Sequence, residues 1–469
     1  MNLSAIVIRQ AATQSINIAL MIYCARSLDM QDFAFLLFSI NIYGSLILLL
    51  DTGLWSYYQR TSRDEANKIH GSILKINSVI GLVAASLLIV FFTIFDGSNV
   101  HGKLEKITII IVVLLAAANQ IYQSVAAHYE KNFLTERLAI VEIIQAALFA
   151  SIVFAVVYFS GDIWIIIFAF ASRSAFSLVI FNDLNKVENS YQIRQVCNIF
   201  SKNKHLVRQA ALFQANKWLS AVRDIAVIWM VTNYLGKEGY GVYSWLVMLG
   251  GYGSLILMIQ QRLYLPYFAL LNFNQMITEH ANVVIEFIKR NVIYLYPSLF
   301  FALLHLDELV VLVFGNQWSP FSPLVPFFCA SMLFTPITIV LVSYFDGISK
   351  SGINFLMNIF WTVATIIAVS VFSFGLSLEQ YAIIHAALQL LNVFYIAYFY
   401  YVTNEIIWLL KIVPSIAASI LIAFFGEISF RIITNAELNS IISYATVFII
   451  IFTIGLFYTK RFIHVECSD

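Results

Sequence analysis

The sequence predicts an all-α polytopic membrane protein, and its composition and the length of its apolar segments are the observations that predict it. Of its 469 residues, 61% are hydrophobic and 11% are charged, whereas a soluble domain carries about 25% charged residues. The apolar runs are long enough for helices that cross a bilayer. Transmembrane barrels show short alternating segments instead. The chain is therefore expected to lie in a lipid bilayer.

Apolar segments of this length recur along the whole chain, and we expect about 14 transmembrane helices. They are predicted at 4–24, 33–56, 72–95, 106–127, 138–159, 162–183, 209–232, 240–262, 284–306, 321–345, 352–374, 379–401, 406–427 and 438–459. The longest connections between them are 184–208 and 263–283, so no large domain is expected outside the bilayer.

Lysine and arginine are unevenly distributed over the predicted loops. With the N-terminus in the cytoplasm, 19 of the 27 fall in cytoplasmic segments, five in outside segments and three within helices. Because positive charge is retained on the cytoplasmic side, we expect both termini in the cytoplasm and a location in the inner (cytoplasmic) membrane. The net charge of +1 gives no footprint for nucleic acid.

An internal repeat divides the chain. Residues 17–38 and 224–245 align at a constant offset of 207, and in each a short polar turn with an acid follows a leucine. The hexapeptide YGSLIL occurs at 43–48 and again at 252–257, after a two-residue slip. Six predicted helices separate the copies, so both halves enter the bilayer from the same side. This is a parallel repeat, and such proteins bind substrate where the halves meet.

The repeat predicts two lobes around a central cavity. The N-terminal lobe is expected at 1–200 with helices one to six, and the C-terminal lobe at 201–401 with helices seven to twelve. Additional helices are expected at 402–469. The first two helices of each lobe should line the cavity.

The predicted helix at 208–235 carries three charged residues in its interior, Lys217, Arg223 and Asp224. Charge within a membrane helix is costly and faces protein or water. On a helical wheel the polar residues of this segment fill a wedge of about 120°, while Trp218 points the opposite way. Adjacent in sequence, Arg223 and Asp224 are not expected to point at each other. The first predicted helix has a similar polar face. It is formed by Arg9, Gln10, Thr13, Gln14 and Asn17.

Three stretches resemble the polysaccharide (Wzx-type) flippases of the multidrug/oligosaccharidyl-lipid/polysaccharide (MOP) exporter superfamily. They are 25–60, with an Asp-x-Gly-Leu ending, 233–246, with Leu-Gly-x-x-x-Tyr-Gly-x-Tyr character, and 308–328, with Gly-x-x-Trp and downstream prolines. The resemblance implies a two-lobed bundle that moves an undecaprenyl-diphosphate-linked oligosaccharide between leaflets by alternating access. It also implies a cationic central cavity, an ion gradient as energy source, and a polysaccharide polymerase with chain-length machinery as partners.

A diphosphate needs cations when it leaves water, and Arg and Lys suit phosphate oxygens. Five cations on the predicted lining helices are therefore candidate substrate ligands: Lys217, Arg223, Arg9, Arg60 and Arg262. The last three lie near the cytoplasmic boundary, where topology signalling is the alternative. Candidates for proton or sodium coupling are Asp224, Asp51 and Glu142. Their alternatives are a pair partner, a helix-end acid and a boundary residue.

The sequence does not predict an enzyme. No catalytic triad, HExxH, P-loop or paired-cysteine motif is present, so no metal or cofactor is expected beyond coupling H⁺ or Na⁺. Three alternative functions stay open: export of another lipid-linked polymer, such as a teichoic-type chain or cell-wall precursor; export of cationic drugs; and a polysaccharide polymerase or ligase. Drug export would favour unpaired acids, and the enzyme would favour a large outside loop.

Overall fold

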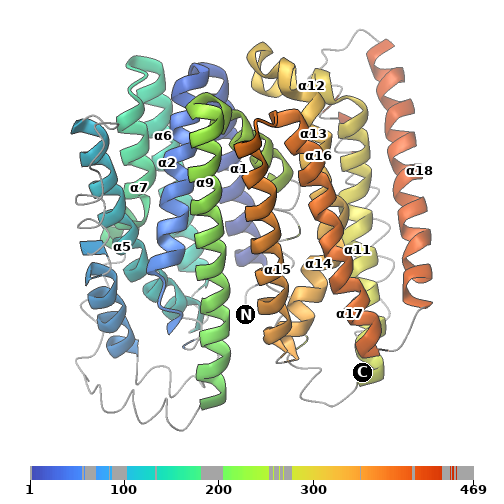
Figure 1. Cartoon of the computed structure of the whole chain (residues 1–469), viewed down its shortest axis with the longest axis horizontal. Helices are drawn as coiled ribbons and strands as arrows, with labels where there is room; N and C mark the ends of the chain where they lie inside the picture. The colour runs from blue at the N-terminus through green and yellow to red at the C-terminus, as the bar shows by residue number, and fades with distance from the viewer. Residues whose placement is uncertain are drawn as a thin grey trace. The chain divides into compact units, whose positions relative to one another are not determined.

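The structure is a computed structural model. It describes residues 3–54, 58, 70–83, 85–86, 103–131, 135–180, 204–252, 257, 264, 268, 277–348, 350–403, 407–435, 444, 446, 447 and 450. Within these ranges the regular secondary structure is helical and contains no strand, which confirms the predicted all-α fold (Figure 1).

The helices follow one another with short connections. In chain order they are α1 (Leu3–Ser27), α2 (Met30–Leu50), α5 (Lys103–Lys131), α6 (Thr135–Phe159), α7 (Ile163–Ile180), α9 (Lys204–Tyr252), α11 (Ile277–Leu304), α12 (Leu306–Phe314), η2 (Asn316–Leu324), α13 (Val325–Cys329), α14 (Ser331–Gly347), α15 (Ser351–Ser370), η3 (Val371–Phe374), α16 (Leu378–Leu388), η4 (Gln389–Asn392), α17 (Val393–Thr403) and α18 (Ile407–Asn435).

Eight helical stretches among the described residues are long and apolar enough to cross a membrane. They make the chain a multi-pass membrane protein. Neither α1 nor α9, the two helices with predicted polar faces, is among the eight. The predicted total of about 14 stays a prediction, since spans such as 438–459 lie largely outside the described residues.

The chain forms two compact units. Unit 1 comprises Met1–Ser244 with Asn358–Ser373, and unit 2 comprises Trp245–Met357 with Phe374–Asp469. The lobes predicted at 1–200 and 201–401 and the helices at 402–469 follow the repeat rather than these units, and they stay a prediction.

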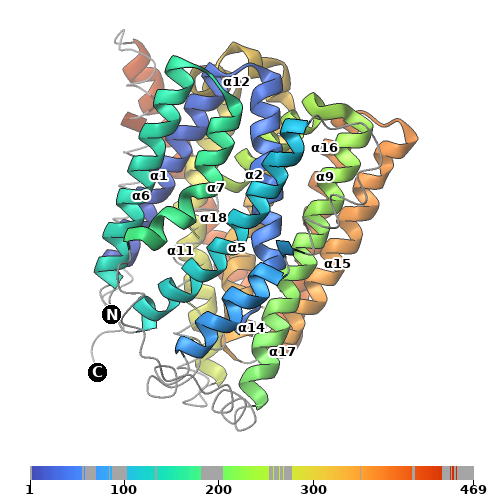
Figure 2. The ribbon, with the colours of Figure 1, turned by 90° about the vertical axis from the view of Figure 1, so that its left-hand side faces the viewer.

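Within unit 1, α1 packs along α6, and α5 packs against α7 and α2 (Figure 2). Their buried faces are apolar, with Leu20, Phe33 and Val113 almost fully covered. In water, burial of apolar surface stabilises a fold by about 25 cal/mol per Å². In a bilayer close van der Waals packing takes over much of this role. The rigid bundle holds α2 in place for the contacts described below.

The α9 segment contains a break at Gly236, where φ is +74°. At the equivalent place in the first repeat, 207 residues earlier, Asp29 separates α1 from α2, and its side chain accepts a hydrogen bond from the Asp32 N–H at 2.7 Å. The helix is thus broken at the same place in both copies, by an N-cap in one and by a glycine in the other. The two parts of α9 correspond to α1 and α2.

Equivalent residues of the two copies also touch each other. Gln31 Nε2 donates to Glu238 Oε1 at 2.5 Å, and the two residues are 207 positions apart. Ala34 and Gly241 have the same offset, and a Cβ added at Gly241 would overlap that of Ala34. Equivalent positions meet only at an axis that relates the copies. These contacts within unit 1 support the predicted parallel repeat.

Unit 2 is organised around α11, which packs against α18 and α14. Trp318 is fully buried and stacks on Trp245, with ring centroids 4.6 Å apart. His305 follows α11, and its Nε2 lies 2.6 Å from Glu427 on α18. The Gly-x-x-Trp stretch singled out in the sequence is thus part of a packed aromatic core.

Candidate substrate site

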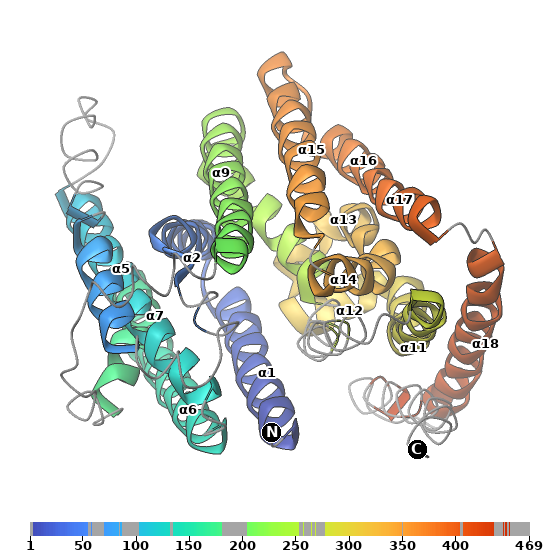
Figure 3. The ribbon, with the colours of Figure 1, turned by 90° about the horizontal axis from the view of Figure 1, so that it is seen from below.

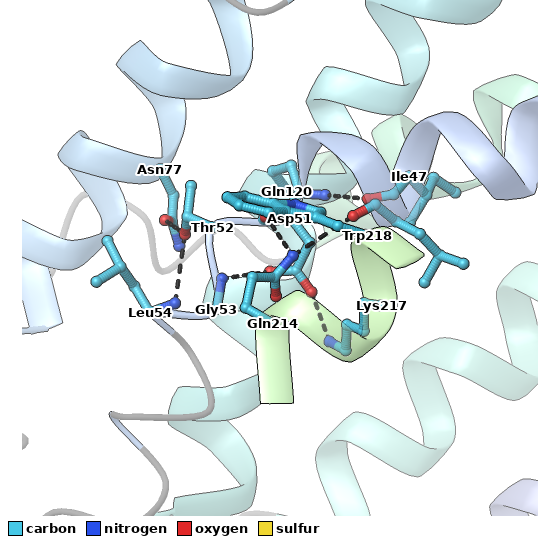
Figure 4. Close-up of polar contacts among 11 residues, drawn as sticks. Ile47, Asp51, Thr52, Gly53, Leu54, Asn77, Gln120, Gln214, Lys217 and Trp218 are labelled. Atoms are coloured by element: carbon cyan, nitrogen blue, oxygen red, sulfur yellow. Dashed lines mark hydrogen bonds and ion pairs between the residues drawn. The ribbon is translucent and has the colours of Figure 1, made fainter. Parts of the chain in front are cut away.

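The site begins at the turn that ends α2. Asp51 is the C-cap, and its own N–H donates to the Ile47 carbonyl at 3.1 Å. The Gly53 N–H donates to Asp51 Oδ1 at 2.8 Å, which closes a short turn stabilised by the side chain (Figure 4). Gly53 has φ +72°, a conformation that favours glycine.

This turn is docked on α9. The Asp51 carbonyl accepts two hydrogen bonds, from Gln214 Nε2 at 2.6 Å and from Trp218 Nε1 at 3.1 Å. A Cβ added at Gly53 would lie 2.8 Å from the Gln214 Cβ, so the absence of a side chain permits the close approach. Trp218 was predicted to point away from the polar wedge. The prediction was wrong for its indole N–H, because the long side chain reaches back to the turn.

Lys217 forms an ion pair with Asp51. Its Nζ lies 2.5 Å from Asp51 Oδ2, and the side chains are 20% and 9% exposed (Figure 4). The Nζ also lies 5.1 Å from the centre of the Phe213 ring. The sequence singled out both charged residues but assigned them separate tasks, substrate binding and ion coupling. The structure brings them together in one partly buried pair.

Uncharged polar residues surround the turn from the side of α2 and α5. Thr52 Oγ1 donates to Asn77 Oδ1, and Asn77 Nδ2 donates to Ser124 Oγ at 2.7 Å. Gln120 Nε2 donates to the Ile47 carbonyl at 2.9 Å. Asn77, Gln120 and Gln214 were not among the residues predicted from the sequence. Each is a polar residue in a largely apolar segment, which is the signal that could have identified it.

Arg223 and Asp224 form the second charged pair of α9. Arg223 Nη2 and Nε lie 2.8 and 2.9 Å from Asp224 Oδ1. The expectation that these neighbours do not point at each other was wrong, because the long arginine side chain folds back along the helix. The pair is more open than the first, with side chains 21% and 41% exposed.

Part of the polar face of α9 contacts α15. Asn358 Nδ2 donates to the Asn216 carbonyl at 2.9 Å and approaches Ser220 Oγ at 3.3 Å. Figures 1 and 3 show this part of α15 running beside α9. The polar wedge predicted from the wheel is therefore used by helix contacts at Asn216 and Ser220.

Arg9 lies in the interior of unit 1 and is 2% exposed. It pairs with Glu130 at 3.0 Å and with Glu142 at 3.6 Å, and Tyr122 donates a hydrogen bond to Glu142. In this conformation Arg9 and Glu142 hold α1, α5 and α6 together rather than face a ligand. Substrate binding by Arg9 and ion coupling by Glu142 stay predictions. Arg60 and Arg262 lie outside the described residues.

In the part of the chain that the structure describes, no group of three or more His, Cys, Asp and Glu side chains could hold a metal ion. Cys24 and Cys329 are buried free thiols. The Asp51–Lys217 ion pair joins the end of α2 to α9, and the Arg223–Asp224 pair lies within α9.

The fold can be compared with the folds of known proteins. No protein-family model matches the chain, and no curated protein does. Solved structures do. A lipid II flippase, MurJ, in an inward closed conformation matches with a TM-score of 0.64 and 14% identity over 97% of this chain and 99% of its own.

A multidrug resistance MATE transporter of the MOP superfamily, in its inward-facing conformation, matches with a TM-score of 0.61 and 12% identity. That match covers 87% of this chain and 98% of the transporter. A third structure, a MOP transporter from Pyrococcus furiosus, is described as having a binding pocket of reverse polarity, and it matches with a TM-score of 0.54 and 12% identity over 91% and 94%. The chain therefore has the fold of MOP-superfamily transporters and flippases, and its substrate has to be argued from its own residues.

Proposed function

We propose that the protein flips undecaprenyl-diphosphate-linked oligosaccharide repeat units across the inner membrane for surface polysaccharide synthesis, such as O-antigen or capsule. Transport follows alternating access and uses a proton or sodium gradient. The product passes to a polysaccharide polymerase and its chain-length machinery. Both termini lie in the cytoplasm in this proposal.

The observation that carries the proposal is the pair of cations on one helix, Lys217 and Arg223, each with its side chain about a fifth exposed. Lys217 pairs with Asp51 and Arg223 pairs with Asp224, so both cations are held in place, six positions apart on α9. Lysine and arginine both suit phosphate oxygens, which prefer charged donors, and a diphosphate offers two such groups.

The lengths of the structural matches also support a lipid-linked substrate. The match to the lipid II flippase extends over 97% of this chain, whereas the match to the MATE transporter extends over 87%. Architecture alone does not decide the substrate. It makes the flippase the more complete template for the whole length of this chain.

The proposal is tested by restoring surface polysaccharide in cells that lack the gene. Lys217→Ala alone would remove a cation that pairs with Asp51, an acid that is 9% exposed, and loss of one partner of a buried pair is destabilising. Two variants are therefore compared: the double variant Lys217→Ala with Asp51→Asn, and the single variant Arg223→Ala. For each we expect normal insertion into the membrane and loss of surface glycan. Lys411→Ala, on the exposed face of α18, is the matched control and should restore it.

Normal surface glycan in both cation variants would overturn the proposal. The alternative within the same fold, export of a cationic drug, is favoured by the 41% exposure of the Asp224 side chain. Under that alternative, loss of the gene lowers drug resistance and leaves surface polysaccharide unchanged. Asp224→Asn would then abolish the resistance, while Arg223→Ala would not.

A further inference from the structure

Lys217 already has an anion within the fold. Asp51 Oδ2 lies 2.5 Å from its Nζ, and the acid is 9% exposed. Any phosphate that binds Lys217 must compete with this carboxylate. A bilayer is rich in lipids whose headgroups carry one phosphate, and an uncompensated lysine facing them would bind these headgroups without discrimination.

Competition with a fixed carboxylate favours ligands of higher charge. The Coulomb energy between two groups rises in proportion to the charge on each. For a headgroup with a single negative charge, the attraction energy gained at Lys217 is about equal to the energy lost when the lysine leaves Asp51. A diphosphate carries more charge and more acceptor oxygens, so its gain exceeds the loss.

The geometry lets Lys217 leave without loss of the turn. The Asp51 carbonyl stays bound to Gln214 and Trp218, and Asp51 Oδ1 stays bound to the Gly53 N–H at 2.8 Å. These three hydrogen bonds do not involve the lysine. Lys217 has a flexible four-carbon stem, and its side chain is 20% exposed. The Asp51 carboxylate is therefore held in place, whereas the Lys217 side chain can move.

We propose that Asp51 is a specificity-determining residue: a built-in counter-anion that makes Lys217 selective for diphosphate headgroups over singly charged phospholipid headgroups. The inference rests on the proposed function, since it assigns selectivity to the same site. It differs from the ion-coupling role expected for Asp51 from the sequence. Asp51 disfavours singly charged headgroups because they must displace its carboxylate from Lys217.

The test measures two dissociation constants for the full-length protein in nanodiscs of phosphatidylcholine, one for undecaprenyl diphosphate and one for phosphatidylglycerol. Asp51→Asn removes the charge, and its amide oxygen can still accept from the Gly53 N–H. We expect this variant to bind phosphatidylglycerol more tightly, so that the preference for diphosphate falls about ten-fold or more, in line with measured couplings between close charge pairs.

Two variants control this experiment. Glu286→Gln neutralises an acid that pairs with Lys289 at 3.4 Å on α11, outside the proposed site, and should leave the preference for diphosphate unchanged. Asp51→Glu keeps the charge and should retain most of the preference. If Asp51→Asn does not insert, Asp51→Ser replaces it, because its hydroxyl also accepts from Gly53.

The outcomes separate this inference from the proposed function. If the wild type does not bind undecaprenyl diphosphate, both fail. If the wild type prefers diphosphate and the Asp51→Asn variant shows the same ratio of dissociation constants, the inference alone is overturned. An equal fall in the ratio for Glu286→Gln also overturns the inference, since the loss of any one negative charge from the protein would then explain the effect.

Discussion

The two ends of α2 contact α9 by different means. At its N-terminal end, Ala34 packs on Gly241 with no space for a further atom, and the Gln31–Glu238 hydrogen bond beside it is exposed. At its C-terminal end, the contact is polar, with the Asp51–Lys217 ion pair at its centre. The first contact depends on close packing, and the second depends on an ion pair. A contact made by charge responds to a charged ligand, whereas one made by shape does not.

The largest effect is expected at the shape-based contact. Gly241→Leu places a side chain where even a Cβ would lie 2.8 Å from the Ala34 Cα. We expect a loss of about 3 kcal/mol of stability or failure to fold, since overpacking against backbone cannot relax. Thermal unfolding of the purified protein measures this. Gly44→Leu on α2 is the control, because nothing lies within 4 Å of a Cβ there. Equal stability of the two variants would contradict the contact.

The ion pair comes next. Lys217→Ala leaves a buried acid without its cation, and we expect a loss of about 2 kcal/mol, less than for a fully buried pair because the lysine is 20% exposed. The double variant with Asp51→Asn should recover most of this loss. Thermal unfolding of the four proteins in a double-mutant cycle checks it. Additive losses would show that the two side chains are not coupled.

A smaller effect is expected at Gly53. Gly53→Ala meets both a positive φ of +72° and the Gln214 Cβ at 2.8 Å, for a cost of about 1–2 kcal/mol. Gly161→Ala measures the cost of the positive φ alone, since Gly161 has φ +64° and nothing lies within 4 Å of its Cβ position. The difference in unfolding temperature between the two variants reports the docking of the turn. No difference would mean that the turn is not held against α9.

The smallest effect is expected at the exposed hydrogen bond. Gln31→Ala and Glu238→Ala should each change stability by less than about 0.5 kcal/mol, because solvent replaces the lost partner. Chemical or thermal unfolding would detect a larger change. A loss above about 1 kcal/mol would show that this end of α2 also depends on polar contacts, which would remove the contrast between the two ends.

The sequence predicted the fold class because composition and apolar length determine it directly. It also predicted that Lys217 and Asp51 matter, since charge in an apolar helix is costly. It could not predict that they pair, because they lie 166 positions apart and a helical wheel describes one helix at a time. The wheel also failed for Trp218 and Arg223, whose long side chains reach beyond the direction of their Cβ atoms.

Asp29 and Gly236 show where the sequence was informative in a way that only the structure explains. The two residues align at the repeat offset but share no chemistry. One caps a helix and the other supplies a positive φ, so both break the helix at the same place in the repeat. Arg9 shows the reverse case, since its position near a boundary gave no signal of its buried pairing with Glu130.

The meeting of Ala34 with Gly241 also constrains how this chain can change over time. Two positions that occupy the same place in the repeat and touch each other cannot both carry large side chains. Among relatives with the same repeat, a bulkier residue at one position should be accompanied by glycine at the other, and pairs in which both are large should be missing. Positions 34 and 241 are in this sense a single trait, divided between two helices.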